Sequence, residues 1–367
     1  MNPKIAIVLP PKEQFTDQYA GAVALCMADF TAHSRFREST RIFGGTKATF
    51  GILNYTQIAD WKRWYLRDNY AYAIKLLAII KADRYTHVEI QNRPLIHRYI
   101  AKNSPASVAV SLHLHNDPQS MEGLKSLTER QWALDHSAAI YCVSEFIRQK
   151  FLAGLTRVLN KVHVVYNGID TQKQCSVSKE KIILYVGRII QEKGALPLSE
   201  ALTMVAAQLP DWQFVICGAD RFNILSEYET ATHRNLTKLG QQCQYTGYIS
   251  HREVMHYFAR AEIAVIPSVW EEPFGRTVLE AMSGAAAVIT SGSGGIKEIV
   301  ANTSLIVNPV TPAGLAAAIS QLSGDSALRI TLQQQGHKRA VDAFDIRLIA
   351  AQLDDLRDGI YSTTASM

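Results

Sequence analysis

The sequence predicts an α/β protein built from two doubly wound domains with parallel sheets. Apolar runs of strand length alternate with longer helix-compatible stretches along the whole 367-residue chain, and this alternation is typical of parallel sheets covered by helices. A chain of this length is also long enough for about two domains. Its 47% hydrophobic and 19% charged residues indicate a soluble globular protein with packed cores.

The order of apolar runs predicts where the domains begin and end. Expected strands in the first half cover residues 4–10, 87–92, 108–115, 139–144 and 162–165, with a long helix over about residues 55–84. Expected strands in the second half cover residues 182–186, 213–217, 244–246, 263–267, 286–290 and 305–307. A polar linker within 171–180 separates the two series, so we expect a first domain at 1–173 and a second at 174–345. A final helix in residues 346–367 is expected to follow.

Charge and cysteine usage limit the class of protein. Residues 1–180 hold 23 Lys and Arg against 15 Asp and Glu, a net charge of +8, and the remainder carries −3. A basic first half predicts an anionic partner there, such as a membrane surface, an anionic acceptor or nucleic acid. The five cysteines are odd in number and scattered, which favours reduced thiols in the cytoplasm. We expect no transmembrane helix and no signal peptide, because no apolar run is long enough.

One stretch carries the clearest chemical signal, from Glu272 to Met282. Pro273 and Gly275 predict a tight loop, and the residues after Gly275 favour a short helix. The first turn of a helix offers unpaired N–H groups that suit phosphate or sugar oxygens. Two carboxylates, Glu272 and Glu280, flank that turn and would accept hydrogen bonds from hydroxyl groups. A sugar nucleotide has both kinds of group.

A second signal lies at the end of the first strand of the second half. Gly187 ends this strand and is followed by Arg188 and, five residues later, Lys193. The planar fork of an arginine and the point charge of a lysine both suit phosphate oxygens. The alternative is that the two are surface cations beside a turn.

The two signals together resemble a known family. Glu272 and Glu280 in the pattern Glu-x7-Glu-Ala-Met, with Pro-Phe-Gly-Arg-Thr between them and Gly294-Gly295-Ile296 soon after, resemble the donor-binding motif of glycosyltransferase family 4. That family comprises retaining enzymes with the GT-B fold, in which two Rossmann-like domains face each other across a cleft. The resemblance implies that the last helix packs back onto the first domain.

The resemblance also implies roles for individual residues. Glu272 would bind the hydroxyls of the donor sugar, Glu280 the ribose, and Arg188 with Lys193 the diphosphate, where they would stabilise the leaving group. Backbone groups near Gly218 and Gly247 would bind the base, on which Tyr248 would stack. The full set of expected donor-binding residues is Gly21, Gly187, Arg188, Lys193, Gly218, Tyr248, Glu272, Phe274, Gly275, Arg276, Thr277 and Glu280.

The first domain is expected to supply a catalytic histidine and acceptor contacts. His113 and His115 share one face of an expected strand, so alternation does not separate them. We favour His115, because it begins the His-Asn-Asp-Pro run that resembles the family. Asn92 and Arg93 follow another expected strand and are expected to face the acceptor, with a structural role in the loop as the alternative.

The resemblance implies a hexosyltransferase that uses a nucleoside diphosphate sugar. A UDP-sugar is favoured and GDP-mannose is the alternative, with a glycan or lipid-linked acceptor of lipopolysaccharide or capsule biosynthesis. No Asp-x-Asp with surrounding metal ligands is evident, so no metal or other cofactor is expected. A sugar-nucleotide epimerase of the same fold, or a non-catalytic basic module that binds membrane or RNA, are the alternatives. The paired acidic and basic site argues against a nucleic-acid partner.

Residues 61–67 predict contact with a membrane. Trp61, Trp64 and Tyr65 would share one face of the helix expected over 55–84, beside Lys62, Arg63 and Arg67. Aromatic and basic side chains favour the headgroup region of an anionic bilayer. This predicts a cytoplasmic protein that is peripheral on the inner face of the plasma membrane. The alternative is that the aromatic rings pack inward.

Overall fold

The computed structural model describes residues 3–16, 21–47, 54–59, 61–62, 67–173, 177–219 and 226–365. The chain forms two compact units. Unit 1 comprises residues 1–168 together with 346–367, and unit 2 comprises residues 169–345. The expected boundaries after residues 173 and 345 remain predictions beside this division into units.

Unit 1 contains one parallel sheet in the order β3-β2-β1-β4-β5-β6-β7. Its strands are β1 (Ile5–Val8), β2 (Thr40–Gly44), β3 (Tyr55–Gln57), β4 (His87–Gln91), β5 (Ala109–Leu114), β6 (Ile140–Cys142) and β7 (Val162–Val164). The strand order reverses between β1 and β4, as in other doubly wound sheets. Polar side chains at the ends of β4 and β5 therefore lie close to this switch point.

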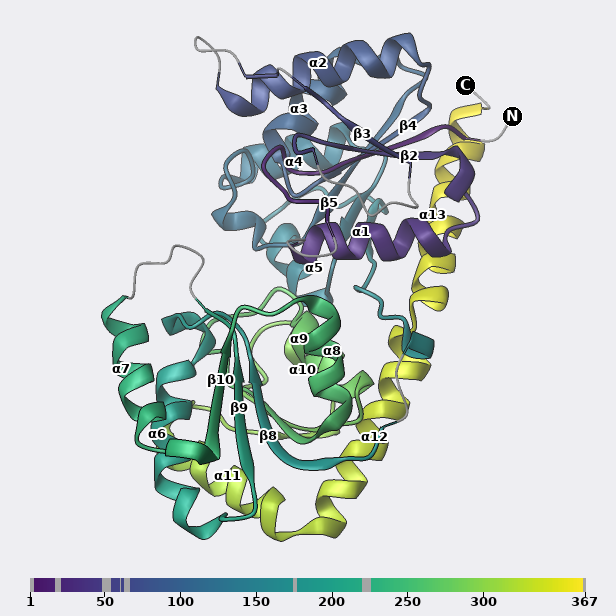
Figure 1. Cartoon of the computed structure of the whole chain (residues 1–367). Helices are drawn as coiled ribbons and strands as arrows, with labels where there is room; N and C mark the ends of the chain where they lie inside the picture. The colour runs from purple at the N-terminus through teal and green to yellow at the C-terminus, as the bar shows by residue number, and fades with distance from the viewer. Residues whose placement is uncertain are drawn as a thin grey trace. The chain divides into compact units, whose positions relative to one another are not determined.

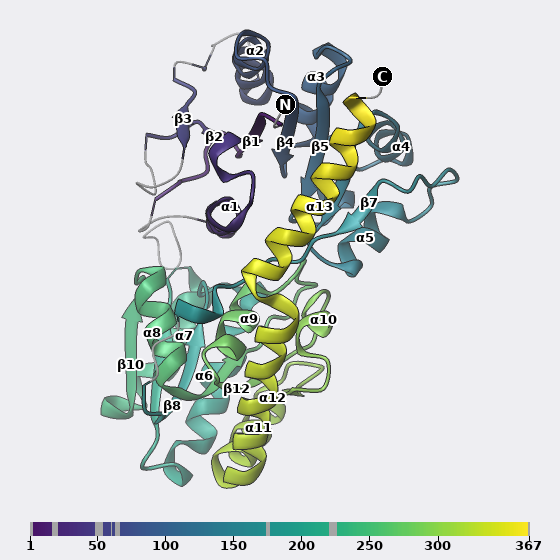
Figure 2. The same ribbon diagram turned by 90° about the vertical axis from the view of Figure 1, so that its right-hand side faces the viewer.

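Helices cover the sheet of unit 1 (Figure 1). They are α1 (Ala22–His33), α2 (Asp68–Ala82), α3 (Pro94–Asn103), α4 (Leu127–His136), α5 (Glu145–Leu152) and α13 (Ile346–Ala365). The last of these, α13, packs against α1, and both contribute to one apolar core with β1, β2 and β6. Figure 2 shows α13 running along this unit. The end of the chain therefore completes the domain that its beginning starts.

Unit 2 contains a second parallel sheet in the order β10-β9-β8-β11-β12-β13. Its strands are β8 (Glu180–Val186), β9 (Gln213–Cys217), β10 (Cys243–Gly247), β11 (Ala261–Ile266), β12 (Ala287–Thr290) and β13 (Ser304–Ile306). Its helices are α6 (Ala195–Val205), α7 (Glu227–Thr237), α8 (His251–Arg260), α9 (Arg276–Ser283), α10 (Ile296–Val300), α11 (Pro312–Gly324) and α12 (Ser326–Phe344). Helices α6, α7 and α11 pack into one layer, and α8, α9 and α12 into another.

Every expected strand is present, but the region between β1 and α2 differs from the expectation. Residues 55–57 form β3, which pairs with β2 through Tyr55 and Ile42, and α2 begins only at Asp68. Neither β2 nor β3 was expected. A strand of three half-buried residues is too short to show alternation. The long helix over 55–84 is therefore wrong in its first half.

This difference corrects the expected position of Trp61, one of the residues on which the membrane expectation rests. Trp61 lies outside any helix, is only 5% exposed and packs edge-on against Tyr72, with ring centroids 5.6 Å apart. Its indole therefore stabilises the core of unit 1 and cannot lie among lipid headgroups. Trp64, Tyr65 and Arg63 lie outside the described residues. Trp61 therefore does not lie on a helix, and it cannot share a helix face with Trp64 and Tyr65 as expected.

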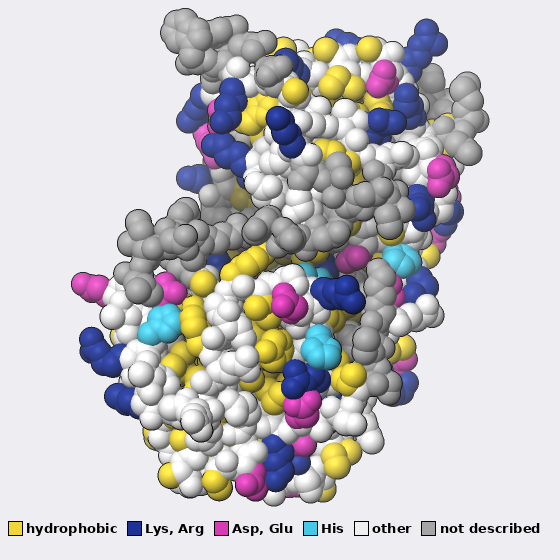
Figure 3. All heavy atoms as spheres, viewed as in Figure 1, with side chains coloured by type: hydrophobic (Ala, Val, Ile, Leu, Met, Phe, Trp, Pro, Cys, Tyr) yellow, Lys and Arg dark blue, Asp and Glu magenta, His cyan; other side chains and the backbone are white. Residues whose placement is uncertain are grey.

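The surface keeps the charge asymmetry of the sequence. Figure 3 shows more Lys and Arg than Asp and Glu side chains on the visible face of unit 1, in agreement with the net charge of +8 over residues 1–180. Within the described ranges, no helix is both long enough and apolar enough to cross a membrane.

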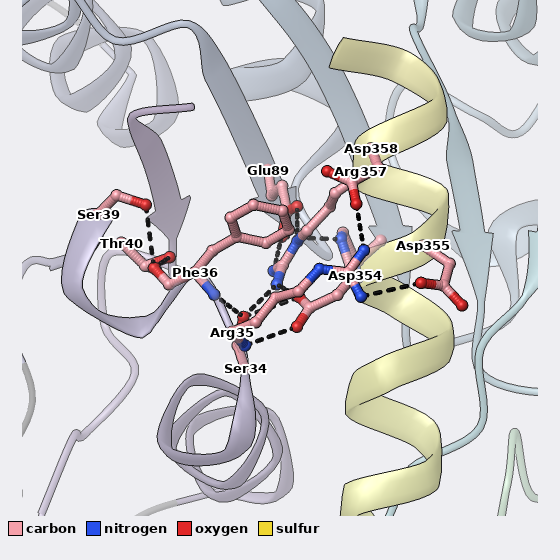
Figure 4. Close-up of polar contacts among 11 residues, drawn as sticks. Ser34, Arg35, Phe36, Ser39, Thr40, Glu89, Asp354, Asp355, Arg357 and Asp358 are labelled. Carbon is pink, nitrogen blue, oxygen red and sulfur yellow. Dashed lines mark hydrogen bonds and ion pairs between the residues drawn. The ribbon is translucent and has the colours of Figure 1, made fainter. Parts of the chain in front are cut away.

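A buried ionic network fastens α13 to the sheet of unit 1 (Figure 4). The Arg357 guanidinium donates to both oxygens of Glu89 on β4, at 2.7 and 2.8 Å, and to Asp354 at 2.8 Å. Asp354 also accepts from the Ser34 hydroxyl at 2.7 Å. Burial alone would raise the pKa of Glu89, but the adjacent guanidinium outweighs it and holds that pKa well below its usual range.

Replacing Arg357 tests the importance of this network. We expect Arg357→Leu to destabilise unit 1 by about 3–5 kcal/mol, because it leaves the Glu89 carboxylate buried without its cation. Hydrogen exchange of β4 and β5 amides would measure the loss, with β11 amides of unit 2 as the internal reference. Arg35→Ala is the matched control, since its pairs with Asp355 and Asp358 are exposed and should contribute less than about 1 kcal/mol. Equal losses in the two variants would contradict this interpretation.

Candidate functional site

Tight backbone packing builds the loop between β11 and α9. Gly275 caps α9 with a left-handed φ of 104°, and a Cβ at that position would come within 2.7 Å of Ile296. The Gly295 N–H donates to the Glu272 carbonyl at 2.8 Å, and a Cβ on Gly294 would lie 2.3 Å from the same oxygen. The glycines at these positions are thus required for the two loops to touch. This packing fixes the position of Glu272.

The Glu272 carboxylate is buried beside a cation. It is 7% exposed, and its Oε1 accepts from Lys193 Nζ at 2.5 Å and from the Ser268 hydroxyl at 2.7 Å. Lys193 ends a short 3-10 turn after β8, and its ammonium also lies 5.6 Å from the Trp270 ring centroid. The structure therefore brings together two residues that were expected in the site from separate motifs. Ser268 was not expected in the site, although a polar residue just after the end of a strand is typical of a binding site.

Glu280 forms a second buried acidic centre, within α9. It is 5% exposed, and its Oε1 accepts from His251 Nε2 and from Arg276 Nε, each at 2.8 Å. Burial would raise the pKa of Glu280, but His251 and Arg276 together lower it to about 2. The group is thus an ionised acceptor at neutral pH. His251 is the first residue of α8, and no sequence motif indicated it.

The ends of β8, β9 and β10 meet through glycines at the same edge of the sheet. The Gly187 N–H donates to the Cys217 carbonyl at 3.0 Å, and the Gly218 N–H donates to the Gly247 carbonyl at 2.8 Å. A Cβ on Gly218, whose φ is 140°, would lie 1.9 Å from the Gly187 oxygen. The ends of β8 and β9 can therefore approach this closely only because Gly218 lacks a side chain. The Arg188 side chain is exposed beside them.

The remaining donor-site candidates of unit 2 differ in exposure. Tyr248 is 58% exposed just after β10, so its ring is accessible for stacking. Thr277 and Arg276 are half-buried in the first turn of α9. Phe274 is buried, with its ring edge-on to Phe344 at 6.1 Å. The Phe274 side chain belongs to the core, so any contact it makes with a ligand would come from its backbone.

In unit 1 the two candidate histidines have different surroundings. His113 is buried, with Nε2 3.4 Å from Glu89 Oε2. His115 is half-buried beyond the end of β5, with Nε2 2.9 Å from Gln91 Oε1. The two rings stack with centroids 6.4 Å apart. His113 is therefore enclosed by the network around Arg357, and His115 is the more accessible of the two.

Asn92 and Arg93 hold the chain at the end of β4. Asn92 has a φ of 55° and is buried; its Oδ1 accepts from the His115 N–H at 3.2 Å. The Arg93 guanidinium donates to the Asn92 carbonyl at 2.8 Å. The contact with the His115 N–H is consistent with a structural role for Asn92 in the loop, because it holds the backbone of His115 in place. Arg93 is half-buried.

Gly21 caps α1. A Cβ there would come within 2.3 Å of Glu13 Oε1, at the end of a flexible side chain, so the space alone does not require glycine. Among the described residues no cluster of three His, Cys, Asp or Glu side chains has an arrangement suited to a metal ion.

Comparison with known proteins adds independent information. The family model described as Glycosyl transferases group 1 matches residues 169–339, and the model described as Glycosyltransferase Family 4 matches residues 31–173. The two matches together run through most of both units. Each model thus corresponds to one of the two sheets.

Several relatives and solved structures are similar to this chain. A Bacillus subtilis (strain 168) protein named as a glycosyltransferase, YtcC, is 27% identical over 77% of this chain and 75% of its own. The lipopolysaccharide 1,2-N-acetylglucosaminetransferase of Salmonella typhimurium is 24% identical over 65% of this chain and 64% of its own. The structure of Anabaena HepE with UDP and glucose superposes with a TM-score of 0.76 at 18% identity, covering 97% of this chain and 99% of that one.

The surroundings of His115 predict a neutral imidazole. Burial, and then the nearby His113, lower the pKa of His115 from 6.5 to about 3. The unfolded chain therefore takes up this proton before the folded one, and the contribution of His115 to the free energy of unfolding falls as the pH drops from about 6.5 towards 3. We expect the His115 ring signals in NMR spectra, assigned with His115→Gln, to stay constant from pH 8 to pH 5. A titration midpoint near pH 6.5 would contradict this prediction.

Proposed function

Because this chain belongs to the family 4 glycosyltransferases and has their GT-B fold, we propose that it transfers a hexose from a nucleoside diphosphate sugar with retention of the anomeric configuration. The observation that carries the proposal is the contact between Lys193 and Glu272 beside the start of α9. A buried carboxylate that accepts hydrogen bonds, a cation and a helix N-terminus are together suited to a sugar joined to a diphosphate.

The donor we favour is a UDP-sugar, with GDP-mannose as the alternative. Support comes from the HepE structure, which contains UDP and glucose. In unit 2, the exposed Tyr248 offers a stacking surface for either base, and the backbone groups at the ends of β9 and β10 offer hydrogen bonds. Main-chain contacts do not depend on residue type, so the sequence does not distinguish uracil from guanine. A binding assay with UDP and GDP identifies the base.

The reaction breaks the bond between the anomeric carbon and the diphosphate oxygen. Negative charge grows on the diphosphate, where Arg188, Lys193 and the N–H groups at the start of α9 would stabilise it. Lys193 has three N–H donors, so it can retain Glu272 and still donate to a phosphate oxygen. The acceptor hydroxyl attacks the same face of the sugar, and its proton passes to the departing phosphate. This route uses no metal, and His115 is assigned to the donor sugar by the resemblance.

The acceptor we propose is a glycan or a lipid-linked glycan of cell-surface polysaccharide biosynthesis. The Salmonella relative is named for lipopolysaccharide, and the net charge of +8 over residues 1–180 favours an anionic acceptor or membrane surface. The buried Trp61 takes no part in such a contact. Peripheral attachment to the inner face of the plasma membrane is proposed here on the basic charge of the first half of the chain.

A transfer assay tests the function. UDP-sugars and GDP-mannose labelled in the sugar would be incubated with the enzyme and either a lipid extract or a soluble glycan fraction, and the labelled product counted. We expect one donor to give product, and Glu272→Gln to lower turnover roughly 10²–10³-fold through loss of a preorganised polar contact. Glu271→Gln, at the exposed neighbouring position, is the control and should change turnover little. Label released as free sugar or epimerised donor, without acceptor, would overturn the proposal.

Arg188→Ala tests the diphosphate assignment. We expect calorimetric titration to show at least about tenfold weaker binding of the nucleoside diphosphate, since a charge-assisted contact is lost, with unchanged binding of the nucleoside. Arg252→Ala, at an exposed position in α8, is the control. Equal losses for both ligands would remove the assignment. Transfer in EDTA should match transfer without it, and a requirement for added divalent ion would disprove the metal-free route.

A further inference from the structure

We infer that His251 is a positioning residue for the nucleotide site, which aims the Glu280 carboxylate at the ribose hydroxyls and so makes the site select ribonucleotides. The inference rests on the proposed function, because it takes a nucleoside diphosphate sugar as the donor. It concerns a residue that neither the motif nor the spacing of the sequence indicated. All the groups involved belong to unit 2.

Two donors from different helices hold one oxygen of Glu280. Arg276 reaches Oε1 from the preceding turn of α9, four residues away, and His251 reaches the same oxygen from the start of α8. Contacts from two directions fix both the position and the plane of the carboxylate. One contact from within α9 would leave the carboxylate free to rotate about its last bond.

The second oxygen of Glu280 remains available for a ligand. Within the described part of the chain, Oε2 has no hydrogen-bond partner, yet it is not among the fully enclosed unsatisfied atoms. An ionised carboxylate only accepts hydrogen bonds, and each oxygen can accept two. The adjacent 2′ and 3′ hydroxyls of a ribose are two donors on neighbouring carbons. Oε2 is therefore suited to this diol, and a sugar that lacks one hydroxyl would leave an acceptor unpaired.

The fold of α8 does not depend on the His251 side chain. Ser250 and Glu253 form a reciprocal capping box, in which each side chain accepts from the backbone N–H of the other residue, at 3.3 and 2.9 Å. The helix start is thus held without His251. His251 also lies three residues after Tyr248, the ring expected to stack on the base. Its hydrogen bond consequently joins the segment that would hold the base to the carboxylate that would hold the ribose.

The test compares ribonucleotides with their 2′-deoxy forms. UDP, GDP and ADP would be titrated calorimetrically into the full-length enzyme, and the tightest of them compared with its 2′-deoxy counterpart. We expect the wild-type enzyme to prefer the ribonucleotide. His251→Ala should weaken the ribonucleotide about tenfold, as expected for loss of one hydrogen bond to a charged group. It should weaken the deoxynucleotide less, because that ligand keeps only the 3′ hydroxyl of the pair. His251→Gln, whose amide N–H can take the place of Nε2, should recover most of the preference.

The outcomes separate this inference from the proposed function. If the wild-type enzyme binds none of the three diphosphates, the proposed function fails. If the wild-type enzyme prefers the ribonucleotide but His251→Ala weakens both forms equally, or neither, His251 has only a structural role and the inference fails. His256→Ala, an exposed histidine of the same helix, is the matched control and should retain the wild-type preference. A melting temperature for each variant confirms that it is folded.

Discussion

A carboxylate that leaves water must keep a cation or several hydrogen-bond donors beside it, and three buried glutamates in the described part of the chain illustrate this requirement. Glu89 has Arg357, Glu272 has Lys193 and Ser268, and Glu280 has Arg276 and His251. Burial favours the protonated form of Glu89 and Glu280, and these partners reverse that effect and keep the two carboxylates ionised. In unit 2 the requirement places Lys193 and Arg276 beside two buried carboxylates that the proposed function assigns to the donor.

The ionic pair in unit 1 serves a different purpose from those in unit 2. Arg357 and Glu89 are both 2% exposed in their side chains, so no ligand can reach them, and they fix α13 on the sheet. His113 lies against the same glutamate, whereas His115, two residues on, leaves this enclosure. The network thus ends within β5, and the first accessible residue, His115, follows the strand. A rigid base under His115 is what a precise contact with a small ligand requires.

The sequence predicted most of both sheets, because buried parallel strands are continuous apolar runs. It also pointed to Lys193 and Glu272, which the structure brings into contact, because the residues around them stand at fixed spacings. What the sequence did not reveal has physical causes too. The three residues of β3 are too few to show a periodic pattern, so they were assigned to the beginning of α2. The burial of the Phe274 side chain was also not visible in the sequence, because Phe274 lies between residues expected in the site. His251 is distant in sequence from Glu280, and only packing of α8 on α9 brings the two together.

The position of α13 in the chain has a consequence for biosynthesis. Unit 1 begins with residues 1–168 but is completed by residues 346–367, so all of unit 2 is made in between. During synthesis, Glu89 and the apolar face of α1 lack their contacts with α13 until the residues of α13 have left the ribosome. Unit 2 can fold before that point. A chain that stopped before Arg357 would contain all of unit 2 but would lack the cation that pairs with Glu89. Unit 1 therefore gains its full set of contacts only after unit 2 has been synthesised.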